Sequence, residues 1–203
     1  MLAIPQCIEH FLEKTNLVTG ETEYSFFETV VGCGSSDEET FFDTRIRMGD
    51  KKAEFGTNIE DLEFKKLLWS GILTAIQSSN PQVLQVIQDV DFLKYLLLYI
   101  DPSSNSYAVN RWSAPQLREI QLHALSVLGN VILYMKDDLE QKKGLSCLTK
   151  FLGSTTDAER RERCLKAFNN ASLFDEPYKL RITEEGVMDN LIEFLQQGDD
   201  NSL

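Results

Sequence analysis

The sequence contains few histidine and cysteine residues, two types that often bind metals or act in catalysis. Its 203 residues include only two histidines, His10 and His123, and four cysteines, none in a C-x-x-C pair. Each histidine lies in an apolar helical pattern, without a second ligand at metal-binding spacing. Walker, G-x-S-x-G and H-E-x-x-H motifs are all missing. We therefore expect no enzymatic activity, no catalytic residue, no metal site, no cofactor and no small-molecule substrate.

Long apolar runs and excess positive charge are also missing. No apolar run approaches the ~20 residues needed to cross a bilayer, and the first residues do not form a secretion signal. The chain has 20 basic and 32 acidic residues, a formal charge of −12, which repels nucleic-acid phosphates and anionic lipids. We expect a cytoplasmic protein that binds neither nucleic acid nor membrane.

The four cysteines are interpreted as reduced thiols. Cys7, Cys147 and Cys164 replace apolar residues in helical patterns, which is typical of core positions. Cys33 lies between two glycines in a predicted loop. Catalysis by Cys33 is not expected, because no histidine or basic residue lies nearby in sequence to lower its pKa.

The sequence contains a pattern of apolar residues at helical spacing that occurs more than once. Gly144 in "KKGLSCLTKFL" and Gly186 in "EEGVMDNLIEFL" lie 42 residues apart, and each is followed by apolar residues at helical spacing. A longer helical pattern precedes each glycine, with Asn130 in the first and Asn170 in the second. A short turn is predicted at Asp175-Glu176-Pro177. Together these features predict an internal helical repeat.

A third copy precedes these two, with Asp91 where the glycine would be. A polar loop, "DPSSNSYAVNRWSAP", follows this copy, and Pro115 suits the start of the next long helix. Residues 1–13 have the pattern of a closing helix, and a short strand or hairpin is predicted within the acidic loop at "EYSFFETVV". The predicted organisation is a closing helix at 1–13, an acidic flexible loop at 14–60, repeats at 61–101, 115–154 and 157–197, and a tail at 198–203.

The unit of long helix, connector and closing helix, carried by "VLGNVILYMKDDLEQKKGLSCLTKFLGS" and "AFNNAS…LRITEEGVMDNLIEFLQQ", resembles the armadillo repeat. The resemblance covers residues 61–197. It implies an all-α, armadillo/HEAT-like α-solenoid of about three helical repeats, with a long acidic loop near the N-terminus. In such a fold each repeat leaves an apolar face that the next repeat covers, and the row binds other proteins.

Two stretches, "EFKKLLWSGILTAI" and "WSAPQLREIQLHALSVLGNVILYMKDDLEQKKGLSCLTKFL", are similar to the armadillo-type member of the cilia- and flagella-associated proteins. This resemblance implies a structural scaffold of the central apparatus of the motile axoneme, with axonemal or cytoskeletal proteins as partners. The acidic loop and the short, uncapped array depart from a complete protein of that kind. The alternative is a general peptide- or cargo-binding adaptor in the cytoplasm or nucleus.

Armadillo proteins that carry nuclear-import cargo place a tryptophan four residues before a groove asparagine and clasp lysine-rich peptides between them. Here Asn130 and Asn170 occupy the asparagine positions, but Ser126 and Lys166 replace the tryptophans. Binding of basic import peptides is therefore not expected. The asparagines either bond an extended partner or cap local backbone, and Asn130, Asn170 and Lys166 are candidate partner-binding residues.

The two tryptophans suggest different roles. Trp69 lies in a helix beside apolar residues, which favours burial in the core. Trp112 lies in a polar loop after Arg111 and is the candidate interface aromatic. Packing of Trp112 against its own helix pair is the alternative.

Ser35 and Ser36 each precede an acidic residue by three positions, which suits an acid-directed kinase. They are candidate phosphosites whose modification would make the loop more anionic. Separately, the incomplete first repeat predicts an exposed apolar end around Ile4, Ile8 and Phe11, and marginal stability or self-association.

Overall fold

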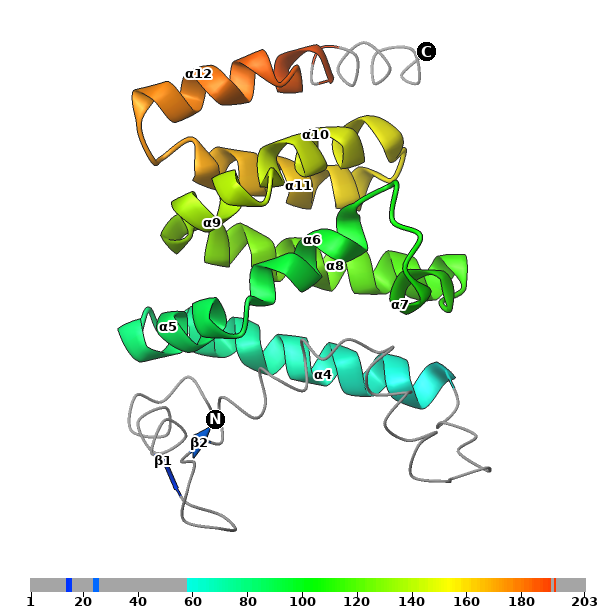
Figure 1. The fold of residues 1–203 in the computed structure, drawn as a ribbon. Coiled ribbons are helices and arrows are strands. Elements are labelled where there is room, and N and C mark those ends of the chain that lie inside the picture. The colour runs from blue at the N-terminus through cyan, green and yellow to red at the C-terminus, as the bar shows by residue number, and fades with distance from the viewer. Residues whose placement is uncertain (1–13, 16–23, 26–57, 191, 193–203) are drawn as a thin grey trace.

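The computed structural model describes residues 14–15, 24–25, 58–190 and 192 (Figure 1). The predicted helix at 1–13, most of the 14–60 loop and the tail lie outside these residues, as do Ile4, Ile8 and Phe11. Two short strands, β1 (Lys14–Thr15) and β2 (Tyr24–Ser25), pair antiparallel, with Lys14 opposite Ser25. β2 lies within the stretch predicted to form a strand or hairpin. The first long helix begins at Asn58, three residues before the predicted start of the first repeat.

The rest of the described chain is helical and forms an armadillo-type solenoid of about three repeats. The long helices are α4 (Asn58–Ile76), α8 (Ala114–Val131) and α11 (Ala158–Ala171). The connector helices are α5 (Pro81–Asp89), α9 (Lys136–Gln141) and α12 (Glu176–Glu184). The closing helices are α6 (Phe92–Ile100) and α10 (Gly144–Ser154). Two short elements complete the set: α7 (Tyr107–Asn110), inside the predicted polar loop, and η1 (Ile132–Tyr134), directly after α8.

The long helices lie side by side along the molecule, α4 against α8 and α8 against α11 (Figure 1). Each closing helix packs mainly on the long helix that follows it, α6 on α8 and α10 on α11. One hydrophobic core therefore runs continuously through the row. Because the packing crosses every boundary, the division at 61–101, 115–154 and 157–197 is one proposed way to cut a continuous solenoid.

Three of the helices begin directly after a residue whose side chain caps the helix N-terminus. Asn80, Asp157 and Asp175 each accept a hydrogen bond from a backbone N–H in the first turn of the following helix. The turn predicted at Asp175-Glu176-Pro177 is therefore the beginning of α12. Pro177 fits there because the first turn of a helix does not use its backbone N–H groups internally. Pro115 lies in the first turn of α8, as predicted.

The turn between connector and closing helix repeats with the same backbone conformation three times. Asp91 (φ 54°), Lys143 (φ 53°) and Gly186 (φ 79°) are all in the left-handed region. The hydrogen bonds repeat as well: the N–H of each residue donates to the carbonyl three positions earlier. Gly186 therefore corresponds to Lys143 and not to Gly144. The spacing of 42 residues, which pairs Gly144 with Gly186, was wrong by one residue.

Gly144 has a different reason to be glycine. A Cβ atom at this position would lie 2.2 Å from Leu139 Cδ1, so any other residue would force the buried Leu139 side chain to shift where α10 approaches α9. The closing pattern then superposes cleanly as "GLSCLTKFL" on "VMDNLIEFL", with a leucine and a Phe-Leu pair in common. Phe92 and Val187 occupy the Gly144 position in the other two copies.

The buried face of each long helix holds the same positions. Trp69, Ala124 and Cys164 correspond, and all three are fully buried. In the first copy the core is filled by aromatic rings, because Trp69 makes edge contacts with Phe92 at 6.2 Å and Tyr99 at 5.4 Å. The prediction that Trp69 is a core residue is confirmed.

A candidate protein-interaction face on the long helices

Three rows of equivalent positions form what we call the long-helix face. Residues spaced three or four apart lie on one side of a helix, and the shared buried positions fix which residues correspond. The rows are Gly71, Ser126 and Lys166; Ala75, Asn130 and Asn170; and, two residues past the end of each long helix, Ser78, Leu133 and Leu173. Three of the four sequence-predicted partner-binding residues are brought together on this face.

Both asparagines use their amide nitrogens within the chain. Asn130 Nδ2 donates to the Ser126 carbonyl at 2.8 Å in its own helix, and Asn170 Nδ2 donates to the Gly129 carbonyl of α8 at 2.6 Å. Asn170 thus links α11 to α8. Neither amide oxygen makes a hydrogen bond to another described residue, so both remain available as acceptors.

The positions that hold tryptophan in import receptors differ from one another here. The Ser126 hydroxyl donates to the Leu122 carbonyl at 2.9 Å and accepts from Arg163 Nη1 at 2.9 Å, so it is committed to the junction of α8 and α11. Lys166 is exposed, and no described residue is within ion-pair distance of its ammonium. It is the cation of the long-helix face that can meet a partner's carboxylate.

Trp112 does not lie on this face. Its side chain is 6% exposed and belongs to the hydrophobic core, and the Arg111 guanidinium lies 4.3 Å from the ring centre. Of the two interpretations of Trp112, packing within its own repeat is the one the burial supports. Its indole Nε1 is buried and makes no hydrogen bond within the described chain.

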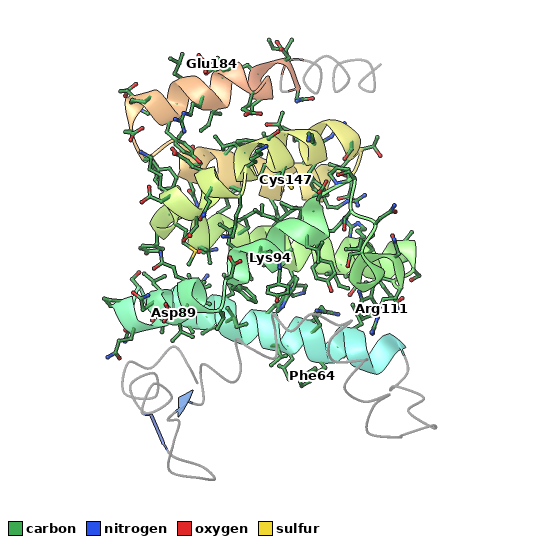
Figure 2. All side chains as sticks on the ribbon, viewed as in Figure 1. Phe64, Asp89, Lys94, Arg111, Cys147 and Glu184 are labelled. Carbon is green, nitrogen blue, oxygen red and sulfur yellow. The ribbon has the colours of Figure 1, made fainter. Side chains whose placement is uncertain are left out.

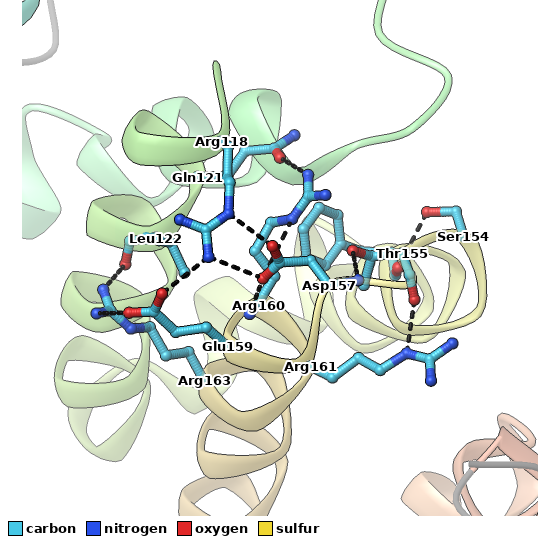
Figure 3. Close-up of polar contacts among 11 residues, drawn as sticks. Arg118, Gln121, Leu122, Ser154, Thr155, Asp157, Glu159, Arg160, Arg161 and Arg163 are labelled. Carbon is cyan, nitrogen blue, oxygen red and sulfur yellow. Dashed lines mark hydrogen bonds and ion pairs between the residues drawn. The ribbon is translucent and has the colours of Figure 1, made fainter. Parts of the chain in front are cut away.

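A network of ion pairs joins α8 to α11 beside this face (Figure 3). Arg118 Nε lies 2.6 Å from Asp157 Oδ2, and Arg118 Nη2 lies 2.9 Å from Glu159 Oε2. Arg163 then pairs with Glu159 at 2.7 Å. The Arg118 guanidinium lowers the pKa of the Asp157 carboxyl, and the bond from the Arg160 backbone N–H adds to that effect.

Gln121 joins three helices from a buried position. Its Nε2 donates to the Tyr99 carbonyl at 3.0 Å, and its Oε1 accepts from Arg160 Nη1 at 2.7 Å. α6, α8 and α11 therefore meet at one amide, whose hydrogen-bonding groups are satisfied on both sides. Sequence reasoning missed this residue, and the available signal was a glutamine between Ile120 and Leu122 on the apolar side of the helix.

The junction between α4 and α8 is also charged. Lys66 Nζ lies 2.8 Å from Glu119 and 2.9 Å from Glu63. His123 lies close to this pair, and burial lowers its pKa, with the positive charges of Lys66 and Arg163 adding to the effect. His123 is partly buried in α8, which agrees with its interpretation as a helix histidine.

Exposed leucines complete the long-helix face. Leu133 and Leu173 correspond in successive repeats, and both are exposed, each one turn beyond an asparagine. Sequence reasoning missed them because they continue the apolar helical pattern and nothing local distinguishes an exposed leucine from a buried one. Together with Lys166 and the two amide oxygens they give the face a mixed apolar and polar character.

Of the described cysteines, Cys164 is buried and Cys147 is partly buried, and both are free thiols. The Cys147 thiol donates to the Leu97 carbonyl at 3.7 Å and the Cys164 thiol to the Leu148 carbonyl at 3.5 Å. Burial raises the pKa of Cys147 to about 12 and that of Cys164 further. No group of three or more His, Cys, Asp or Glu residues within the described ranges is placed to hold a metal ion.

Cys33, His10 and the candidate phosphosites Ser35 and Ser36 lie outside the described residues. Among the helices that the structure does describe, none combines the length and apolarity needed to cross a bilayer.

Comparison with known families identifies the repeat. The sequence model of "Cilia- and flagella-associated protein 69, ARM repeat" matches residues 40–177. The chain belongs to this family. No curated protein sequence matches it. The family confirms the resemblance to an armadillo-type cilia- and flagella-associated protein, and the armadillo repeat is a scaffold-type domain that generally mediates contacts between proteins.

Proposed function

We propose that the chain is a non-enzymatic scaffold that forms part of the central apparatus of the motile axoneme. It holds neighbouring axonemal or cytoskeletal proteins in place and supports ciliary or sperm motility. Its locations are the cytoplasm and the axoneme of the cilium or flagellum. The observation that supports this function most directly is membership of a cilia- and flagella-associated armadillo family over residues 40–177.

The long-helix face is the proposed binding surface. An extended partner segment that crosses α8 and α11 meets the unused amide oxygens of Asn130 and Asn170, which accept hydrogen bonds from its backbone. Its apolar side chains cover Leu133 and Leu173, and an acidic side chain pairs with Lys166. This mode differs from basic-peptide binding, because the face has the cation of Lys166 at a position where import receptors have a tryptophan side chain.

Proximity labelling of the full chain in multiciliated cells tests the location. We expect labelled proteins to be those of the central-pair microtubules, with outer-doublet proteins labelled weakly. Labelling spread evenly over the cytoplasm or nucleus contradicts the axonemal proposal and favours the general adaptor.

A matched set of variants tests the surface. Lys166→Glu and Leu173→Asp change exposed residues of the long-helix face, so we expect each to reduce recovery of the labelled partners without lowering the melting temperature. Lys150→Glu and Leu180→Asp change exposed residues of the same two types on α10 and α12 and serve as controls. Equal loss of partners in both sets contradicts the proposed face.

A further inference from the structure

Polar side chains bridge the contact between α8 and α11, which we call the α8–α11 junction. Arg160 Nη1 donates to Gln121 Oε1 at 2.7 Å, and Arg163 Nη1 donates to the Leu122 carbonyl at 2.8 Å (Figure 3). Near the end of α11, Asn170 makes the hydrogen bond to α8 described above. Polar groups therefore hold this junction at several turns of α11.

Ion pairs join the same two repeats. Arg118 of α8 pairs with Asp157 and Glu159 at the start of α11. On the connector helices, Arg181 Nη1 of α12 lies 2.8 Å from Glu140 Oε1 of α9. The side chains of Arg118, Glu159 and Arg181 are 39%, 44% and 54% exposed, so dissolved ions reach these pairs and screen them.

The apolar side of α11 is small in comparison with that of α8. Three fully buried aliphatic residues of α8 are replaced on α11 by an arginine and two alanines: Ile120, Val127 and Val131 correspond to Arg160, Ala167 and Ala171. Phe168 is the one large apolar side chain that α11 buries. Because stabilisation by burial is roughly proportional to the apolar area removed from water, α11 gains less from its core contacts than α8 does.

The boundary between the first and second repeats is more apolar. Lys66 and Glu119 form an ion pair between α4 and α8 there. The closing helix α6, however, packs on α8 with a sequence, FLKYLLLYI, whose buried residues are all apolar or aromatic. α8 adds large buried side chains of its own, such as Leu125 and Leu128. Since salt screens charges and not apolar contacts, we expect salt to weaken this boundary less than the α8–α11 junction.

We propose that the α8–α11 junction is a salt-sensitive hinge, at which α11 and α12 open from the row as one unit while α4 and α8 stay folded. The stability of a repeat row is approximately a sum of the stabilities of its repeats and of the contacts between neighbours. The boundary with the least apolar burial and the most exposed charge therefore opens first. α12, which carries Glu184 in Figure 2, lies beyond α11 at the end of the row.

Opening of the hinge divides the long-helix face. Asn130 and Leu133 lie on the α8 side of the junction, and Asn170 and Leu173 lie on the α11 side. Loss of the bond from Asn170 to the Gly129 carbonyl separates the two halves, so a partner segment that spans both is released. This consequence rests on the proposed function, whereas the opening of the junction does not.

Hydrogen exchange of the full chain, measured without a partner at about 0.1 M and about 1 M sodium chloride, tests the opening. At the lower concentration the long-range repulsion from the formal charge of −12 is already largely screened. We expect the amides of α11 and α12 to exchange together, faster than those of α8, and about fivefold faster at the higher salt.

Three results would overturn the hinge. In the first, α8 is accelerated by salt as much as α11, which indicates global unfolding. In the second, α12 exchanges faster than α11 and salt has no effect, which indicates simple fraying of the end. In the third, α11 is protected as strongly as α8 at both salt concentrations. None of these results depends on where the chain acts in the cell or on what it binds.

A matched pair of variants tests the cause. Arg118→Gln removes the ion pairs with Asp157 and Glu159 and leaves α11 itself unchanged. We expect exchange in α11 and α12 to rise about fivefold at low salt and to lose most of its salt dependence, with α4 unaffected. Lys66→Gln breaks the ion pair between α4 and α8 and should leave α11 and α12 unchanged. Equal effects of both variants on α11, or full salt dependence in Arg118→Gln, would overturn the proposal.

Discussion

Lys143 and Gly186 hold the same backbone position in successive repeats, 43 residues apart, and both have a left-handed conformation. A residue with a Cβ pays roughly 1–2 kcal/mol in this region, whereas glycine does not. The fold therefore tolerates a lysine and an aspartate at two of the three turns because the helices on either side hold the backbone in place.

Substitutions at these two turns should change stability in opposite directions. Gly186→Ala introduces a Cβ at φ 79° and is expected to lower the free energy of unfolding by about 1 kcal/mol. Lys143→Gly removes one at φ 53° and is expected to raise it by about 0.5 kcal/mol, after the greater freedom of glycine in the unfolded chain is subtracted. Urea unfolding measures both, and changes of the same sign would contradict the shared backbone position.

Gly144→Ala should destabilise the chain for a steric reason. The new Cβ would lie 2.2 Å from Leu139 Cδ1, and Leu139 is fully buried and has little room to move. We expect a loss of about 1–3 kcal/mol in the free energy of unfolding. Adding Leu139→Ala removes the clashing atom, so the double variant should lose less than the sum of the two single losses. Additive losses would mean that the contact is not the cause.

Asp157 should make stability depend on pH at the acid end. Its pKa is lowered in the folded chain, first by the Arg118 guanidinium, so the ionised form is favoured by folding. The contribution is present above the usual aspartate pKa of about 3.9 and is lost as the pH falls through the lower folded value. Unfolding curves between neutral and acid pH should show less acid sensitivity in Asp157→Asn than in the wild type.

Two variants separate the roles of Asp157. Asparagine keeps an acceptor for the Arg160 backbone N–H but loses the charge, whereas alanine loses both. At neutral pH, Asp157→Ala should therefore cost about 1 kcal/mol more than Asp157→Asn. An equal cost for both variants would show that the helix cap contributes nothing.

The thiols of Cys147 and Cys164 should react slowly near neutral pH. Burial raises the pKa of Cys147 to about 12, and Cys164 is completely buried, so almost no thiolate is present near neutral pH. In a Cys7→Ser, Cys33→Ser background, a thiol reagent should label Cys164 only as fast as the helices unfold, and it should label the partly buried Cys147 slowly because little thiolate is present. Rapid labelling that rises steeply between pH 7 and 9 would show an exposed thiol with an ordinary pKa.

The repeat and its helices were predictable because they depend on local pattern. Apolar spacing placed the long helices and the burial of Trp69, and Pro115 marked a helix start. The one-residue slip between Gly144 and Gly186 arose because two glycines with different roles look alike in sequence. One admits a close approach of helices and the other a left-handed turn, and only backbone angles and contacts separate these reasons.

The candidate face was only half predictable. Asn130, Asn170 and Lys166 were recognised by their places in the pattern, but the hydrogen bond from Asn170 to the Gly129 carbonyl joins residues 41 positions apart. Gln121 gave almost no signal, since its two partners come from two other helices, α6 and α11. Trp112 was read as a loop aromatic because the sequence does not show that its loop packs against the core.

The sequence by itself determined the helical repeat, the buried side of each long helix and the lack of catalytic motifs, because periodicity and residue type act within a few turns of chain. Only the tertiary structure decided the register between copies, the partners of the charged and amide side chains, and which apolar residues remain exposed. Those outcomes depend on how neighbouring helices pack, and the packing joins residues from different helices that lie far apart in the chain, such as Arg118 and Asp157 or Asn170 and Gly129.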